Sequence, residues 1–276
     1  MRIGRFLAAA SAALLLTMAF SAKAAMTPIN VTWNPSTTGI TTQGPFSFDN
    51  VVLNTFATID VNSAGTGFTQ QGFLNLSLFN QNGLPTSVPN VGYPSGSPYS
   101  LYISFTGTGT QTAGVPSTGQ FTSLTYSLMG APGVTTFTPN GSGMFSLNGN
   151  AGVALATGSL TSPGSTSLTV DAGTGLLLPA AQLTASFVPN PAFASFFVNP
   201  SASTPLTVTA AFTNTGTVVT SAPIAGGGTR LTLNGGGGNA TLSQAAAVPE
   251  PDTYGMLLAG LGLVGFVARR KYKRHG

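Results

Sequence analysis

The chain has 276 residues, of which 5% are charged, and it contains no cysteine and one histidine. The formal net charge of +4 comes from the two ends, because Arg230 is the only basic residue between positions 25 and 248, where three aspartates leave a net charge of −2. This composition excludes disulfides and thiolate metal sites, and it leaves too few cations to bind nucleic acid through its phosphates.

The first 24 residues have the pattern of a signal peptide. Two arginines precede an apolar run over residues 6–20, and Ala22-Lys23-Ala24 supplies a small-x-small cleavage site. The run has about 15 residues, whereas a transmembrane helix needs about 20. We therefore expect a signal helix over residues 1–24 that is removed, so that the mature chain begins at Ala25.

Residues 25–247 have the pattern of an all-β domain. Apolar and polar residues alternate in several segments, between Gly, Pro, Asn and Ser, and no segment shows helical spacing. The apolar positions are Leu53, Ala57, Ile59 and Val61; Leu74, Leu76 and Leu78; Leu101, Ile103 and Phe105; and Leu206, Val208, Ala210 and Phe212. Many short strands indicate an antiparallel sandwich or barrel, and we expect a jelly-roll-like β-sandwich. A β-solenoid ranks second, because no fixed repeat is present.

Two stretches are expected to connect strands. Residues 83–100 contain four prolines and predict a long loop. The runs Gly226–Gly228 and Gly235–Gly238 bracket one last strand around Leu231 and Leu233. The second run has no lysine after it and no nucleotide-binding context, so we expect a flexible linker at the end of the β domain rather than a phosphate loop.

The C-terminal residues 248–276 fall into three ordered parts. Val248-Pro249-Glu250-Pro251 precedes an apolar run from Tyr254 to Ala268, and a basic cluster follows, beginning with Arg269 and Arg270. The run is about 22 Å long as a helix, which can span a bilayer if the bilayer thins and basic side chains reach its surface. The positive-inside rule places the basic cluster in the cytoplasm and the β domain across the membrane. A buried amphipathic helix is the alternative, but the run has no polar face.

These three parts resemble the PEP-CTERM sorting signal of Gram-negative bacteria, except that Tyr254 stands where many members carry Trp. The resemblance implies that an exosortase processes the chain. It also implies transient anchoring in the inner membrane by the C-terminal helix, followed by delivery to the cell surface or to the extracellular matrix, where exopolysaccharide is made.

The β domain offers few groups for catalysis. The single histidine is His275, and serines in the domain have no histidine, lysine or cysteine to take their protons. Asp49, Asp60 and Asp171 are its only acidic residues, and turn hydrogen bonds are their usual role. Asp49-Asn50 and Asp60-Val61-Asn62 offer oxygen ligands for calcium, but no known loop spacing is present. We expect no catalytic residue, no metal and no cofactor.

The N-terminal half also resembles the flocculation-associated PEP-CTERM proteins. The likeness rests on Trp33-Asn34-Pro35-Ser36, Phe48-Asp49-Asn50, Asn82-Gly83-Leu84-Pro85 and the segment from Tyr99 to Thr110. It implies a non-enzymatic protein that promotes cell aggregation, in flocs or biofilm, together with exopolysaccharide. The alternatives are a carbohydrate-acting enzyme that uses an Asp pair, and a matrix subunit that self-associates through sheet edges.

Aromatic side chains are the groups expected to stack on sugars in such a protein. The aromatic residues considered for this role are Trp33, Tyr93, Tyr99 and Tyr102. A neutral surface of hydroxyls and amides would hydrogen-bond to the same sugars. Trp33 is more typical of a core residue.

Overall fold

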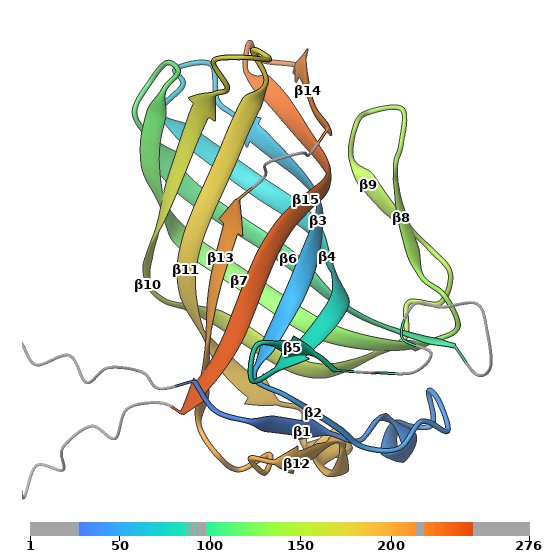
Figure 1. Cartoon of the computed structure of the whole chain (residues 1–276). Coiled ribbons are helices and arrows are strands. Elements are labelled where there is room, and N and C mark those ends of the chain that lie inside the picture. The colour runs from blue at the N-terminus through green and yellow to red at the C-terminus, as the bar shows by residue number, and fades with distance from the viewer. Residues whose placement is uncertain (1–27, 87, 89–90, 92–97, 214–217, 245–276) are drawn as a thin grey trace, which may run out of the picture. The chain divides into compact units, whose positions relative to one another are not determined.

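The computed structural model describes residues 28–86, 88, 91, 98–213 and 218–244, and residues 27–244 form one compact unit (Figure 1). Apart from the short 3-10 helices η1 (Pro35–Thr38) and η2 (Pro191–Phe196), the elements of this unit are β-strands. The strands are β1 (Val31–Trp33), β2 (Phe46–Phe48), β3 (Asn50–Val61), β4 (Gly67–Gln81), β5 (Leu84–Pro85), β6 (Tyr99–Gln111), β7 (Ser117–Pro132), β8 (Thr136–Pro139), β9 (Phe145–Asn148), β10 (Val153–Val170), β11 (Leu177–Pro189), β12 (Phe197–Asn199), β13 (Leu206–Thr213), β14 (Val218–Pro223) and β15 (Thr229–Gln244).

Eight strands of the described unit close into an antiparallel barrel. Their order around the barrel is β13-β11-β10-β7-β6-β4-β3-β15, and β15 then pairs with β13 from Leu206↔Gln244 to Thr213↔Gly237. The predicted antiparallel all-β class is confirmed, whereas the jelly-roll-like sandwich is wrong. A sandwich needs two separate sheets, but β15 is paired on both edges, with β3 and with β13. Alternating side chains give the same pattern in both architectures. The expected flanking helices lie outside the described residues.

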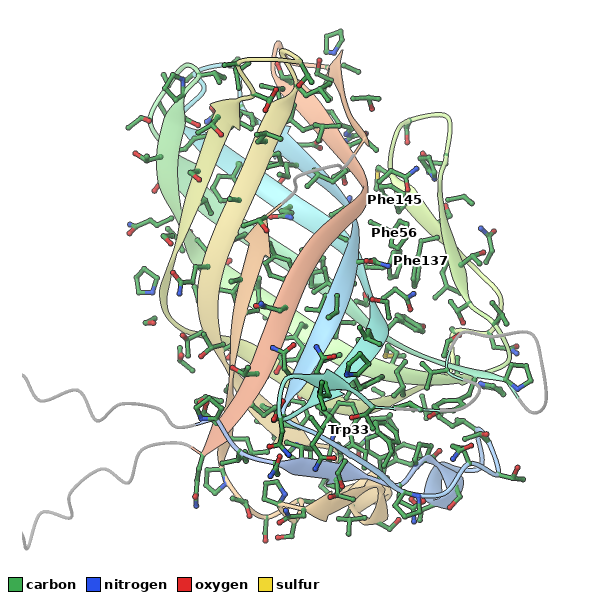
Figure 2. The ribbon with its side chains drawn as sticks, viewed as in Figure 1. Trp33, Phe56, Phe137 and Phe145 are labelled. Carbon is green, nitrogen blue, oxygen red and sulfur yellow. The ribbon has the colours of Figure 1, made fainter. Side chains whose placement is uncertain are left out.

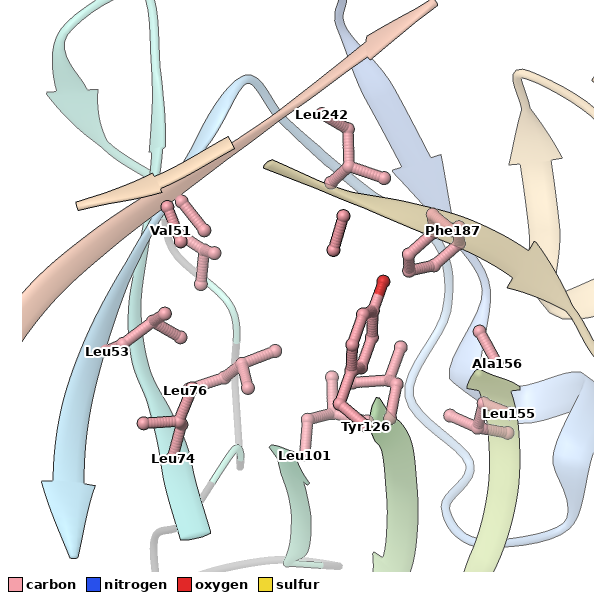
Figure 3. Close-up of a cluster of buried hydrophobic side chains, with 14 of the residues drawn as sticks. Val51, Leu53, Leu74, Leu76, Leu101, Tyr126, Leu155, Ala156, Phe187 and Leu242 are labelled. Carbon is pink, nitrogen blue, oxygen red and sulfur yellow. The ribbon is translucent and has the colours of Figure 1, made fainter. Parts of the chain in front are cut away.

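The predicted alternation decides which side chains face the barrel interior. Figure 3 shows side chains from several strands meeting at its centre. Leu53, Leu74 and Leu101 are buried there, as their period-two patterns predict. Leu78 is the exception, with 39% of its surface exposed. The pairing of β4 with β3 passes from Leu78↔Val52 to Leu76↔Leu53, so Ser77 is an extra residue on β4 and Leu78 no longer shares a face with Leu74.

Aromatic side chains fill the lower end of the barrel, in the orientation of Figure 1. A three-stranded sheet, in the order β12-β1-β2, lies across this end together with η1 and η2. Trp33 of β1 is 3% exposed and its ring lies 4.7 Å from that of Phe48 and 6.2 Å from that of Phe79 of β4. Phe196 lies 5.2 Å from the same indole. These edge-to-face and tilted contacts join the sheet to the barrel core.

A second group of aromatic residues holds the β8–β9 hairpin against the outside of the barrel (Figure 2). Phe137 of β8 stacks on Phe73 of β4 at 4.6 Å and lies 5.3 Å from Phe56 of β3. Tyr102 of β6 joins the cluster, 5.5 Å from Phe137, and its hydroxyl donates a hydrogen bond to the Ala151 carbonyl. The hairpin therefore covers apolar side chains that the barrel turns outward.

The second glycine run lies inside a strand, so its expected role as a linker is wrong. Gly235–Gly238 belongs to β15, where Gly237 pairs with both Asn54 and Thr213. A Cβ on Gly238 would lie 2.4 Å from the Phe212 ring. Glycine is required there because the ring occupies the space of a side chain.

Candidate functional site

The residues of the predicted sorting signal lie outside the described part of the structure. These residues are Ala22, Ala24 and Ala25 of the cleavage site, Val248, Pro249, Glu250 and Pro251 of the motif, and Tyr254, Ala268, Arg269 and Arg270 at the ends of the apolar run. Among the described residues, no helix has the length and apolar character needed to cross a bilayer. The predicted membrane segment therefore remains an expectation from the sequence.

Asp60 forms an ion pair with Arg230 on the outer surface of the barrel. The Arg230 Nε donates to Asp60 Oδ1 at 2.6 Å, and Nη2 donates to Oδ2 at 2.5 Å. Nη1 donates at 2.7 Å to the carbonyl of Ser142, in the loop between β8 and β9. The hydrogen bonds that Arg230 donates to Asp60 raise the pKa of Arg230 above its ordinary value. The pair therefore fixes the hairpin loop to β3 and β15 at the same time.

The other two aspartates hold turns. Asp49 Oδ2 accepts a hydrogen bond from the backbone N–H of Asn82 at 2.6 Å, next to the β4–β5 turn. Asp171 Oδ1 accepts from the Thr174 hydroxyl and backbone N–H, both at 2.7 Å, and from Gly173 N–H at 3.0 Å. The Thr174 hydroxyl is the main cause of the lowered pKa of Asp171. Both carboxylates thus accept hydrogen bonds at turns, which is the usual role of aspartate at such positions.

The three aspartates lie on different parts of the barrel. Asp49 directly precedes β3, and Asp60 lies near the end of this strand. The two residues are eleven positions apart, which is about 36 Å of extended chain. Asp171 follows β10, four positions from β3 around the closed sheet. Glycosidase carboxylates stand about 5–10 Å apart. In the part of the chain that the structure describes, no group of three or more His, Cys, Asp or Glu residues is placed to hold a metal ion.

The aromatic residues considered for sugar stacking are buried where they are described. Trp33, Tyr99 and Tyr102 have exposed fractions of 3%, 0% and 2%, and Tyr93 lies outside the described residues. Burial raises the pKa of Tyr99 and of Tyr102. The hypothesis that these three rings stack on sugars is therefore wrong, because a sugar ring cannot reach them.

Exposed hydroxyls and amides form a continuous outer wall on β4, β6 and β7. The wall comprises Thr69, Gln71, Thr106, Thr108, Thr122, Ser123 and Thr125. Threonine hydroxyls pair across the strands, as between Thr106 and Thr125 at 3.2 Å and between Thr108 and Ser123 at 2.8 Å. A shallow hollow of about 250 Å³ lies over this wall, and Asp60, already paired with Arg230, is the one charged residue among its described lining residues.

The upper half of the barrel interior contains a cavity of about 110 Å³. Its lining is mostly apolar and includes Leu53, Ile59, Phe68, Leu74, Phe105, Phe121, Leu124, Leu183, Leu231 and Leu233. None of the described lining residues is charged. Polar side chains gather near the strand turns of the upper end, as with Gln111 and Ser117, and Tyr126 donates its hydroxyl to the Ser186 carbonyl at 2.7 Å. The cavity is thus an apolar space with a small number of polar groups.

Comparison with models of protein families gives a match in the C-terminal segment. The family model described as the PEP-CTERM protein-sorting motif matches residues 247–271. The chain therefore carries the sorting motif of PEP-CTERM proteins in its C-terminal segment. Neither the comparison with curated proteins nor the comparison with solved structures found a match. The motif indicates that this PEP-CTERM protein is exported and that an exosortase processes it at the membrane.

Sequence reasoning missed the cavity of this PEP-CTERM protein and the role of Arg230. One signal for the cavity is present in the sequence, because Thr55 is a polar residue within the inward-facing series Leu53, Ala57 and Ile59. The partner of Arg230 could not be found in this way, since Asp60 is 170 residues away along the chain.

Proposed function

We propose that this exported protein is a non-enzymatic component of the cell surface or extracellular matrix that promotes cell aggregation by binding exopolysaccharide through its outer wall. The observation that carries the proposal is the uncharged face of hydroxyls and amides on β4, β6 and β7. Such a face can exchange hydrogen bonds with sugar hydroxyls and does not repel an acidic or a basic polymer.

Two further features support a binding role over the alternatives. The carboxylates of Asp49, Asp60 and Asp171 are separated and each is engaged with its neighbours, which does not favour a catalytic pair. Closure of the sheet pairs most strand edges, leaving β14 at the end of the described sheet, which reduces the surface available for edge-to-edge assembly.

The wall can be tested by removing its hydroxyls while keeping the shapes of the side chains. In a strain that lacks the gene, the wild-type chain should restore aggregation, and purified protein should retain exopolysaccharide in a pull-down. The triple variant Thr106→Val, Thr108→Val, Thr125→Val should lose most of both effects, because valine favours strands but cannot hydrogen-bond.

The control changes three exposed residues on another part of the barrel. Thr213→Val, Thr220→Val and Ser221→Ala alter β13 and β14 and should leave aggregation and polysaccharide retention unchanged. Equal binding by wall and control variants would exclude the outer wall as the binding face. A fall in polysaccharide chain length during incubation with the protein would favour the carbohydrate-acting enzyme instead.

A further inference from the structure

The upper half of the barrel interior is not completely filled by side chains. Rings such as Phe68 and Phe105 surround the cavity there, but Ala181, Ala210 and Ala240 also line it and supply only methyl groups. Ala210 and Ala240 lie opposite one another on β13 and β15, so two small side chains meet where larger ones would close the space. Protein interiors are normally packed to the density of organic crystals. A cavity built from small residues on neighbouring strands is therefore a feature that a ligand can use.

Thr55 places one unpartnered hydroxyl in this apolar space. The residue is 3% exposed and lines the cavity, and its Oγ1 has no hydrogen-bond partner within the described structure. Its cross-strand neighbours are Leu74 and Gly236, which bring no polar side chain. A buried water needs two to four polar partners. Burial of a hydroxyl without a partner is unfavourable, so this group points to a ligand that hydrogen-bonds with it.

The chemistry and volume of the cavity restrict the ligand. None of the described lining residues is charged, so a carboxylate or ammonium group would be buried without a counterion. The volume of about 110 Å³ is close to that of an engineered apolar cavity of about 150 Å³ that binds benzene. We propose that the upper half of the barrel binds an uncharged, mostly apolar small molecule, about the size of a single aromatic ring, that carries one oxygen held by the Thr55 hydroxyl.

A matched pair of probes tests the role of this hydroxyl. Fluorobenzene and 4-fluorophenol differ in one O–H group, and fluorine NMR titration of residues 27–244 gives a dissociation constant for each. These residues form one compact unit that contains the whole closed sheet and its core. Thr55→Val keeps the side-chain shape and removes the hydroxyl. The ratio of the two dissociation constants should shift against 4-fluorophenol by about three- to tenfold in Thr55→Val.

A control substitution in the same strand separates the loss of the Thr55 hydroxyl from a general change in β3. Thr58 is also buried but belongs to the opposite face of the strand and lines the outer hollow. Thr58→Val should leave the ratio of the two dissociation constants as in the wild type. Because the ratio compares two probes in one protein, differences in their hydration cancel between wild type and variant.

Filling the cavity tests the location of the probes. Ala210→Leu should abolish binding of both molecules, and Ala240→Leu and Ala181→Leu serve the same purpose if that variant does not fold. The proposal is overturned if the wild type binds neither probe, if Thr55→Val leaves the ratio unchanged, or if the folded leucine variants bind as the wild type does. This outcome is independent of aggregation and of the outer wall.

Discussion

The two ends of the barrel are built from the same strands but are packed in different ways. At the lower end, Trp33 and Phe48 contact rings from β4 and from the covering sheet, and these side chains are fully buried. At the upper end, rings such as Phe68 and Phe121 surround a cavity at which alanines and Thr55 supply only short side chains. Strand alternation is the same in both halves, so the difference comes from small residues at a few inward positions of the upper half and from the layer that covers the lower end. The lower end is suited to stability, and the upper end has the space that the proposed ligand requires.

The largest expected difference between the two ends concerns phenylalanine. Phe48→Ala should lower the free energy of unfolding by about 3–5 kcal/mol, because Phe48 is 0% exposed and packs against Trp33 and Phe79. Phe212→Ala, beside the cavity and partly exposed, should cost less than half as much. Urea unfolding of residues 27–244 measures both changes. Equal decreases in the free energy of unfolding for the two variants would contradict the difference in packing between the two ends.

A glycine shows where the upper end is nevertheless tightly packed. A Cβ on Gly109 would lie 2.2 Å from Phe68 Cζ and 2.4 Å from the Gln120 carbonyl. Gly109→Ala should therefore cost about 1–3 kcal/mol in the same assay, since one of the two neighbours must move. Gly44→Ala is the control, because nothing lies within 4 Å of its Cβ, and its stability should be unchanged or slightly higher. A neutral Gly109→Ala would mean that the upper end is looser than described.

A substitution of Thr55, at the upper end of the barrel, should stabilise the protein, whereas the substitutions of Phe48 and Gly109 should destabilise it. Thr55→Val removes a buried hydroxyl without a partner and should raise the free energy of unfolding by about 1 kcal/mol. Thr58→Val removes a hydroxyl that donates to the Gln71 carbonyl at 3.5 Å, so no gain is expected there. Differential scanning calorimetry distinguishes the two. A loss of stability in Thr55→Val would show that its hydroxyl is well satisfied.

The smallest expected effect depends on pH and concerns the upper turn at Asp171. Hydrogen bonds from Thr174 and Gly173 favour the charged carboxylate and lower its pKa below the usual value of about 3.8. The stabilisation is thus present above about pH 3.8 and is lost as pH falls through the lowered pKa. NMR titration of the Asp171 carboxyl carbon should show this midpoint, and Thr174→Ala should raise it. Thr169→Ala, whose hydroxyl bonds to Leu178, should not change it.

The sequence was sufficient to predict strands and their inward faces, because a period of two is a local property. It could not distinguish a sandwich from a barrel, since closure depends on the pairing of β13 with β15, which no local pattern reports. The bulge that exposes Leu78 was missed for the same reason: it depends on the partner strand.

The candidate sites could likewise be predicted where they depend on local sequence, and not where they depend on contacts between distant residues. The sorting motif was recognised because its parts are contiguous, whereas the cavity is assembled from eight strands of the described barrel. The role of Trp33 was decided by tertiary packing, because an aromatic residue has the same sequence signal in a core as on a sugar-binding face.

The closure of the barrel by β15 has a consequence for the order in which the chain folds. β15 ends at Gln244, three residues before the segment matched by the sorting motif begins, and it supplies the partner for β3, which is made about 170 residues earlier. A chain that is threaded through a membrane from its N-terminus must keep β3 unpaired on one edge until nearly all of it has crossed. Such long-range pairing slows folding and leaves an exposed edge in the meantime. We therefore expect the free edge of β3 to be the place where the incomplete barrel can mispair until its last strand arrives.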